Sequence, residues 1–522
     1  MPNSEVLLRY GERPFREAGI SNSQVLDLFR DLYQTITELH QKRVVIGDFN
    51  DLNVLISNAK AFLVDADSFQ FDKFLCKVFT AKFVDPLLCA PKASSPSLML
   101  PFNHNSDWYA FSVMLMQSLL FVDPYGGVYL PIKSSNKIPH SARPLHHITI
   151  FHPEVRYPKP AIPYETLPDE LLEYFHQIFE KDKREIFPLD LLEKTFFVKC
   201  PSCNVEHAHK TCPLCQFILA IPKQLSTIRG EVTATLIFST SGIIVFAQFQ
   251  SQHLKFLIYQ DGVFKRENGT VVCKQELTPN MRFRIQGSQT LIAHDSIVEK
   301  YTPRDETPQK ILIETYNNLP VFDTNSHSLY WLAGGQLLRS GNLGSVFVGD
   351  ILSNQTLFWC GEKFGFGFYR SGKLNAAFTF DAARGTINDN LQLPPIHGQL
   401  VDSTCVFTQD KCWFFISVRD RDRTINHCHL ISPEGKLEAT SQAVQGDGSW
   451  LGKIRGNLAL GNFLFCATDE GVVRIESDGS DLVKTRDFPD TEPFVDSSNH
   501  LFPAPNGLYV VGRRDVYEIK IT

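Results

Sequence analysis

A unit of strand, glycine turn and strand repeats through roughly the last 300 residues of this chain, and it constrains the fold more than any other feature. Each copy is an apolar run, a glycine, and the start of a second apolar run, which is the pattern of two antiparallel strands joined by a tight turn. Many copies follow a further apolar run. The turn glycines of five copies are Gly262, Gly341, Gly372, Gly435 and Gly479.

The spacing of these units predicts a β-propeller. They recur roughly every 30–60 residues, and propeller blades are about 40–50 residues long. We therefore predict an all-β propeller of six or seven blades over residues 217–522, with a pair of packed β-sheets as the alternative. The strand predicted over Gly507–Ile521 would close the ring against an early strand near Thr233–Phe246.

Length and charge exclude some classes of function. The chain has 522 residues, enough for two to four domains, and a net charge of −6. This balance gives no reason to expect nucleic acid or an anionic membrane as a partner. The first residues lack a secretory signal pattern, and the longest apolar run, Phe111–Val122, is shorter than the roughly 20 residues that span a bilayer. We expect a cytoplasmic protein.

Two Cys-x-x-Cys motifs lie close together in residues 199–216. Cys200 and Cys203 form the first pair, and Cys212 and Cys215 form the second, with eight residues between the two motifs. Four thiolates in this arrangement suit tetrahedral zinc, whereas two disulfides are disfavoured in the cytosol and a redox motif needs one pair. We predict a zinc ribbon with a structural zinc. His207 and His209 are then loop residues, because four thiolates already complete the coordination. The other eight cysteines are scattered, which indicates reduced thiols.

Residues 1–198 carry helical patterns. Apolar residues recur every three or four positions over Ser23–Lys42, with Ser21 or Ser23 as a cap. Further helices are predicted over Trp108–Leu120 and Pro168–Glu180. The complete prediction is a multidomain α+β chain with a mainly helical domain (1–198), a zinc ribbon (199–216) and a propeller (217–522).

The helical part contains polar residues at the spacing of a phosphoryl-transfer site. Asp48 precedes Asn53 by five residues, directly after the first helix, and Asp65 ends an apolar strand twelve residues beyond Asn53. Asp107 opens the second long helix, and Arg184 follows the third. This order resembles the C-terminal lobe of a protein kinase, and in particular a divergent bacterial group of serine/threonine kinase-like proteins in which a zinc ribbon often follows.

The resemblance implies a role for each of these residues. Asp48 would accept the proton of the substrate hydroxyl, and Asn53 and Asp65 would hold Mg²⁺ on the phosphates of ATP. Asp107 would bind the backbone of the catalytic loop from beneath. Arg184 would lie where kinases place the arginine that pairs with the glutamate of their Ala-Pro-Glu motif.

Several positions depart from the kinase pattern. The usual histidine and arginine before the catalytic aspartate are Ile46 and Gly47, and the lysine after it is Asn50. The glycine of the Asp-Phe-Gly motif is Asp67. The glutamate of the Ala-Pro-Glu motif, aligned on Cys89-Ala-Pro-Lys, is Lys92, which cannot pair with Arg184.

No glycine-rich loop and no Val-Ala-x-Lys strand precede Ser23, so the ATP-gripping small lobe is missing from this sequence. Gly365 and Gly367 are interpreted as structural, because they lie in a propeller-type strand. We therefore expect either a truncated serine/threonine kinase-like protein, with a small lobe supplied by another chain, or a pseudokinase scaffold that transfers no phosphate. Both readings expect protein partners on the propeller. A hydrolase site in the propeller is a third reading, without a histidine–carboxylate cluster to support it.

Overall fold

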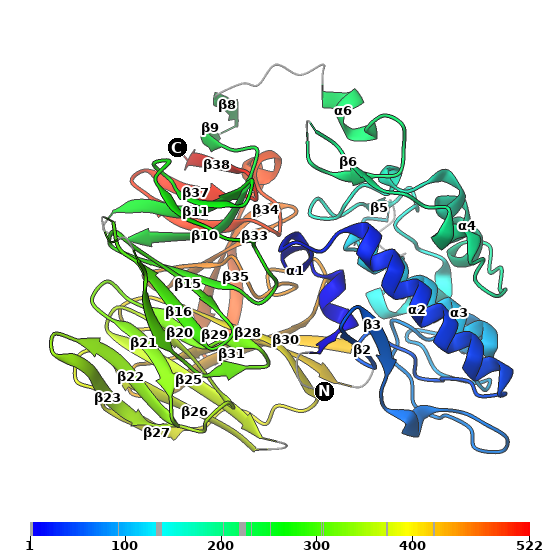
Figure 1. Ribbon diagram of the computed structural model, residues 1–522, viewed down its shortest axis with the longest axis horizontal. Helices are drawn as coiled ribbons and strands as arrows, with labels where there is room; N and C mark the ends of the chain where they lie inside the picture. The colour runs from blue at the N-terminus through cyan, green and yellow to red at the C-terminus, as the bar shows by residue number, and fades with distance from the viewer. Residues whose placement is uncertain are drawn as a thin grey trace. The chain divides into compact units, whose positions relative to one another are not determined.

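The computed structural model describes residues 4–521 except Lys92, 132–137, Ser202, 219–225, Glu231, Ser251, Arg304, Glu306, 372–373 and 421–422. The chain divides into two compact units, with the boundary between residues 222 and 223. The first is called here the N-terminal unit. The second, which holds the remainder apart from residues 421–423, is called the propeller unit (Figure 1).

Three helices form the frame of the N-terminal unit: α2 (Asn22–Gln41), α3 (His104–Leu120) and α4 (Asp169–Phe179). Helix α2 begins where the sequence predicts, because Ser21 and Gln24 cap it reciprocally: the Ser21 hydroxyl accepts from the Gln24 N–H, and the Gln24 side chain accepts from the Ser21 N–H. Every residue of α3 from Ser106 to Leu120 is buried. A helix that is buried on all sides forms the centre of a core.

The remaining elements of this unit are short. Strands β1 (Glu5–Val6), β2 (Val54–Ser57) and β3 (Lys60–Leu63) form one antiparallel sheet. Helices α1 (Arg13–Glu17), α5 (Asp190–Glu193) and α6 (Pro213–Ile218) are one or two turns long. Strands β4 (Val128–Tyr129) and β5 (Val155–Arg156) pair with each other, as do β6 (Val198–Lys199) and β7 (Glu206–His207).

The propeller unit consists of seven blades, each an antiparallel sheet of at least four strands. Blade 1 contains β10 (Ile243–Gln250), β11 (His253–Gln260), β12 (Val263–Arg266) and β13 (Val271–Lys274). Blade 2 contains β14 (Arg282–Gln286), β15 (Gln289–His294), β16 (Ile297–Tyr301) and β17 (Gln309–Leu312). Blade 3 contains β20 (Phe322–Thr324), β21 (Leu329–Ala333), β22 (Gln336–Gly341) and β23 (Gly344–Asp350), after the small pair β18 (Thr315–Tyr316) and β19 (Leu319–Pro320).

The second half of the unit repeats this arrangement. Blade 4 contains β24 (Thr356–Cys360), β25 (Phe364–Ser371), β26 (Leu374–Asp381) and β27 (Ile387–Leu391). Blade 5 contains β28 (Gln399–Phe407), β29 (Cys412–Asp420), β30 (Arg423–Ile431) and β31 (Leu437–Val444). Blade 6 contains β32 (Leu458–Leu460), β33 (Phe463–Thr468), β34 (Gly471–Asp478) and β35 (Asp481–Phe488). Blade 7 contains β36 (His500–Ala504), β37 (Gly507–Val511), β38 (Asp515–Ile521) and β9 (Val232–Ser239), with β8 (Ser226–Arg229) beyond β9.

The blades form a closed ring. The first strand of each blade contacts the first strand of the next, and β36 of blade 7 contacts β10 of blade 1. The last and an early strand of the unit share blade 7, because β38 pairs antiparallel with β9, with Ile519 opposite Ala234. The prediction of six or seven blades is therefore confirmed as seven. The predicted closing strand is present as two strands, β37 and β38.

Apolar side chains fill the spaces between neighbouring blades. Aromatic rings are frequent there, and Phe366 of blade 4 lies 4.6 Å from Phe414 of blade 5, measured between ring centroids. Gly365 and Gly367 are structural, as predicted. A Cβ at Gly365 would lie 2.0 Å from the Phe380 ring, and one at Gly367 would lie 2.0 Å from the Phe378 ring.

Among the described residues β-strands outnumber helices, and the propeller unit supplies most of the strands. Within the part of the chain that the structure describes, no helix is long and apolar enough to cross a membrane.

Candidate functional site

The loop between α2 and β2 is held by the buried carboxylate of Asp107. The Asp107 side chain is fully buried in α3 and accepts from the backbone N–H groups of Ile46 and Gly47, at 2.9 and 3.3 Å. A third contact joins it to His40 Nε2 of α2 at 2.8 Å. One side chain thus satisfies two backbone donors that no helix or sheet pairs. This fixes the backbone directly before Asp48.

Asp48, Asn53 and Asp65 lie together at the base of the β2–β3 hairpin. Asn53 Nδ2 donates to the Asp48 carbonyl oxygen at 3.1 Å, and the Val64 N–H donates to the Asn53 carbonyl at 3.0 Å. Asp65 follows directly with a left-handed backbone, φ 62°. Burial raises the pKa of Asp48, and the Asp65 charge adds to this rise, while hydrogen bonds from Thr80 and Asn50 oppose it. Two carboxylates and an amide are side chains that could ligate a hard cation such as Mg²⁺.

Thr80 and Asn50 complete this loop, and the sequence analysis did not identify Thr80. Both side chains are buried, and Asn50 Nδ2 donates to Thr80 Oγ1 at 3.3 Å and to the Asp48 carbonyl at 3.1 Å. Asn50 Oδ1 accepts from the Leu52 N–H. Asn50 therefore forms hydrogen bonds within the loop, at the position where kinases carry a lysine that contacts phosphate.

Arg184 forms an ion pair that the sequence analysis did not foresee. Its guanidinium binds Asp85 through two bonds of 2.8 Å, and both side chains are less than a tenth exposed. Arg184 also donates to the Ile178 carbonyl at 2.7 Å. Lys92, where we aligned the kinase glutamate, lies outside the described residues.

The four cysteines of the two Cys-x-x-Cys motifs gather at one point. Their sulfur atoms all lie within 4.8 Å of one another, with 3.6 Å between Cys200 and Cys215 and 3.6 Å between Cys203 and Cys212. A tetrahedron with metal–sulfur bonds of about 2.3 Å has edges of about 3.8 Å, so these separations fit a single zinc ion. This cluster could hold a structural zinc.

Hydrogen bonds attach the cysteine segment to the rest of the N-terminal unit. The Glu206 carboxylate accepts from the Asn22 N–H at 2.9 Å, at the positive end of the α2 dipole. His209 Nε2 contacts the Leu167 carbonyl at 2.8 Å, and His207 Nδ1 accepts from the His209 N–H at 3.3 Å. Both histidines thus have partners other than the cysteine sulfurs. None of the twelve cysteines, all of which lie in the described part of the chain, forms a disulfide bond.

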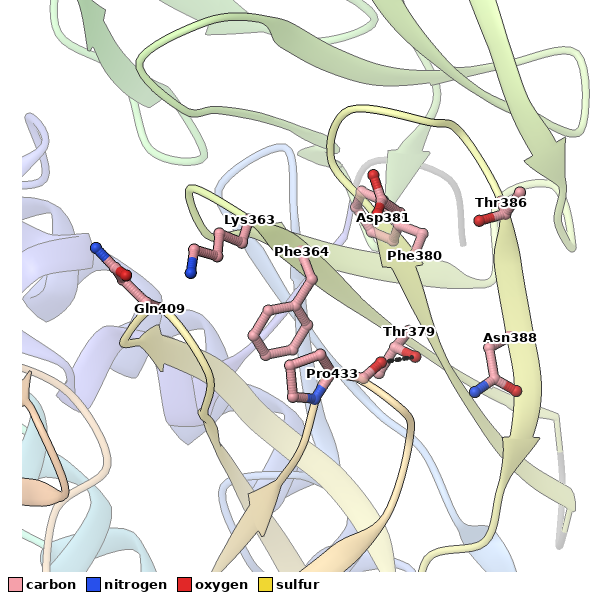
Figure 2. Close-up of a pocket in the computed structure, with 9 residues that line it drawn as sticks. All are labelled: Lys363, Phe364, Thr379, Phe380, Asp381, Thr386, Asn388, Gln409 and Pro433. Carbon is pink, nitrogen blue, oxygen red and sulfur yellow. Dashed lines mark hydrogen bonds between the residues drawn. The ribbon is translucent and has the colours of Figure 1, made fainter.

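The propeller unit contains a hollow of about 290 Å³ between blades 4 and 5 (Figure 2). It is lined by Lys363, Phe364, Thr379, Phe380, Asp381, Thr386, Asn388, Gln409 and Pro433. Asp381 accepts from the backbone N–H groups of Ala383 and Arg384, and Thr379 Oγ1 donates to the Pro433 carbonyl. The residues that line it include no histidine and no cysteine.

No protein-family model matches the sequence, and no characterised protein matches it. Solved structures with some likeness include the extracellular domain of BT4673 from B. thetaiotaomicron (11% identity, TM-score 0.32, covering 56% of this chain and 40% of that one). TolB from Acinetobacter baumannii is another (8% identity, TM-score 0.26, 55% of this chain and 67% of that one). AztD from Citrobacter koseri is a third (11% identity, TM-score 0.25, 51% and 87%). These scores are too low to carry an argument, and the assignment of the propeller rests on its own strand order and ring closure.

Proposed function

We propose that this protein is an interaction scaffold in which a kinase-like N-terminal unit, reinforced by a zinc-bound cysteine cluster, is joined to a propeller that binds a protein partner. The closed ring of seven blades is the observation that carries this proposal. Rings of this kind present many loops on a rigid frame, and loops on rigid frames commonly bind other proteins. Twelve cysteines without a disulfide among them support a cytoplasmic location.

The kinase-like part of the proposal rests on side-chain contacts. Asp107 beneath the loop is the contact that the resemblance to a kinase C-terminal lobe implies, and Asn53 lies against Asp48 in the same loop. Arg184 is buried near the position expected for it, although it pairs with Asp85 and not with an Ala-Pro-Glu glutamate. The same contacts argue against phosphoryl transfer by this chain alone. Asn50 is bonded within the loop where a lysine would neutralise the γ-phosphate, and the sequence offers no glycine-rich loop to cover ATP.

A second candidate function is serine/threonine phosphoryl transfer with a small lobe supplied in trans. The gathering of Asp48, Asn53 and Asp65 favours it, because this set could hold Mg²⁺ once phosphates complete the coordination. Asp48 would then serve as the base and the other two as metal ligands.

A radiolabelled ATP assay separates the two candidates. The full chain should transfer no phosphate above the level of an Asp48→Asn, Asp65→Asn variant, and it should bind Mg-ATP weakly or not at all. Cross-linking mass spectrometry of the full chain, captured with a bound partner, should place the partner on propeller loops. Transfer that disappears in the double variant would favour the kinase, and cross-links confined to residues 4–218 would contradict the scaffold.

A further inference from the structure

Three arginines from two distant blades meet at the end of the ring where the inner strands begin. Arg282 is the first residue of β14 in blade 2, and Arg284 is two positions further on the same side of that strand. Arg455 lies three residues before β32 in blade 6. Arg282 interacts electrostatically with Arg455 and with Asp402 of blade 5. Blade 2 is not a neighbour of blades 5 and 6, so these charges approach one another across the axis of the ring.

Two aspartates each pair with one of these arginines. Arg284 Nε donates to Asp323 Oδ1 of blade 3 at 2.5 Å, while Asp323 Oδ2 accepts from the Cys360 N–H of blade 4 at 2.8 Å. Arg455 binds Asp402 through two bonds of 2.8 and 2.5 Å. Both carboxylates are therefore occupied, and neither is hydrogen-bonded to Arg282 among the described contacts.

Arg282 is the cation without a matching carboxylate. Its Nη1 donates to the Pro320 carbonyl at 2.9 Å, which is its one hydrogen bond among the described residues. A guanidinium has five N–H donors, so most of them are available. Burial, together with the Arg284 and Arg455 charges, lowers the pKa of Arg282 to about 9, and the Asp323 and Asp402 charges oppose this shift. The Arg282 guanidinium is thus a positive charge beside other positive charges, and a bound anion would stabilise it.

A lysine and a histidine extend the same end of the ring. Lys453 Nζ donates to the Ser497 carbonyl, and burial lowers its pKa to about 8. Asp496 and Asp469 raise that pKa and so balance Lys453, although both also accept from backbone N–H groups. His500, the first residue of β36, is exposed, and desolvation by the surrounding protein together with the Lys453 and Arg455 charges lowers its pKa.

We infer that the ring-mouth cluster, defined as Arg282, Arg284, Lys453 and Arg455, binds a phosphate group. Planar guanidinium forks match the oxygen spacing of phosphate, and Arg282, which uses one of its donors, lies near two further arginines. Arg282 is half-buried and Arg455 is exposed, so water and small ions reach the site. The inference does not depend on phosphoryl transfer by the N-terminal unit. The group is either free phosphate or a phosphoryl group carried on a peptide, and the chemistry of recognition is the same.

Titration calorimetry of the full chain at low ionic strength tests the inference, with inorganic phosphate in one arm and a phosphoserine peptide with its unphosphorylated form in the other. We expect saturable binding of a phosphate-bearing probe and none of the unphosphorylated peptide. Equal affinity for inorganic phosphate and the phosphoserine peptide would show that the phosphate group alone is recognised. Tighter binding of the phosphoserine peptide would show that the ligand is a phosphoryl group carried on a peptide.

Arg282→Gln should weaken this binding about 10- to 100-fold, the effect of losing a charge-assisted hydrogen bond. Arg486→Gln makes the same charge change on the exposed face of β35 and should leave the affinity unaltered. Arg282→Lys keeps the charge without the fork and should bind at intermediate strength. The thermal melt of each Arg282 variant, compared with that of wild type, shows whether the ring is intact. The inference is overturned if wild type shows no saturable binding, or if Arg282→Gln binds like wild type.

Discussion

The N-terminal unit and the propeller unit bury titratable side chains for opposite purposes. In the N-terminal unit such groups are bonded to backbone: Asp107 accepts from two N–H groups, and Arg143 donates to the carbonyls of Tyr125, Gly126 and Gly127. In the propeller, His429 is 2% exposed, and its Nδ1 contacts the Thr440 hydroxyl at 3.0 Å. Its Nε2 has no hydrogen-bond partner among the described residues.

The difference follows from how each region pairs its backbone. Strand ladders satisfy most N–H and C=O groups of the blades, so a buried side chain such as His429 has little backbone to support and is best kept neutral, although buried Asp323 accepts from the Cys360 N–H. The N-terminal unit contains long irregular segments, and charged side chains supply the partners that those segments lack. We therefore expect the N-terminal unit to be sensitive to the loss of one charged or metal-binding group. We expect the propeller to lose stability when a buried neutral side chain gains a charge.

The largest effect should come from the cysteine cluster. Cys203→Ser combined with Cys215→Ser should abolish the binding of about one zinc per chain and unfold the surrounding segment, because structural zinc contributes about 10–16 kcal/mol of binding free energy in zinc-finger peptides. Metal analysis and circular dichroism melting would measure this. Cys273→Ser, a scattered thiol in β13, should keep the metal. Wild-type protein that lacks metal at full stability would contradict the prediction.

The next effect should come from the Asp85–Arg184 pair. Asp85→Ala leaves a buried guanidinium without its carboxylate, and breaking a buried pair in this way costs about 3–5 kcal/mol of unfolding free energy. Asp190→Ala removes a carboxylate from an exposed pair with Lys194 and should change the unfolding free energy by less than about 1 kcal/mol. Urea unfolding would compare the two variants. Equal losses would show that the N-terminal unit does not depend on its buried charges.

The smallest of the three effects is a loss of stability at low pH that depends on His429. Burial, with a lesser contribution from His427, lowers the pKa of His429 to about 4, from an ordinary value of 6.5. The unfolded chain then binds a proton that the folded chain does not, so this contribution to stability is complete above pH 6.5 and declines as the pH falls toward 4. It amounts to about 3 kcal/mol over that interval.

Urea unfolding of the propeller, followed from pH 7.5 to pH 4, would measure this decline. In a His429→Gln variant the free energy of unfolding should fall less steeply with decreasing pH than in wild type. Part of the fall should remain, because the pKa values of His427 and His500 are also lowered. Identical pH profiles for the variant and wild type would mean that His429 is not held neutral in the folded ring.

How far the sequence predicted this structure also differs between the two regions. The blades were predictable because their turns are local: Gly262, Gly435 and Gly479 each adopt positive φ between or beside paired strands. The bounds of α2 were predictable from its cap. The Asp85–Arg184 and Asn50–Thr80 contacts were not, because residues far apart in the chain leave no periodic signal. The ring-mouth cluster likewise exists only once separate blades meet.

Closure of the ring through β38 and β9 has a consequence for the protein during its synthesis. Strand β9 emerges from the ribosome roughly 280 residues before β38, which at about 5–20 residues per second is a delay of roughly 15–60 s. Throughout that time blade 7 is incomplete, and the edge of β9 that later pairs with β38 has unpaired backbone groups. Such an edge can pair with the wrong strand. Two chains growing on one messenger could exchange their β38 strands and emerge as an interlocked pair. The rate of translation through the last blades therefore bears on how many chains close on themselves.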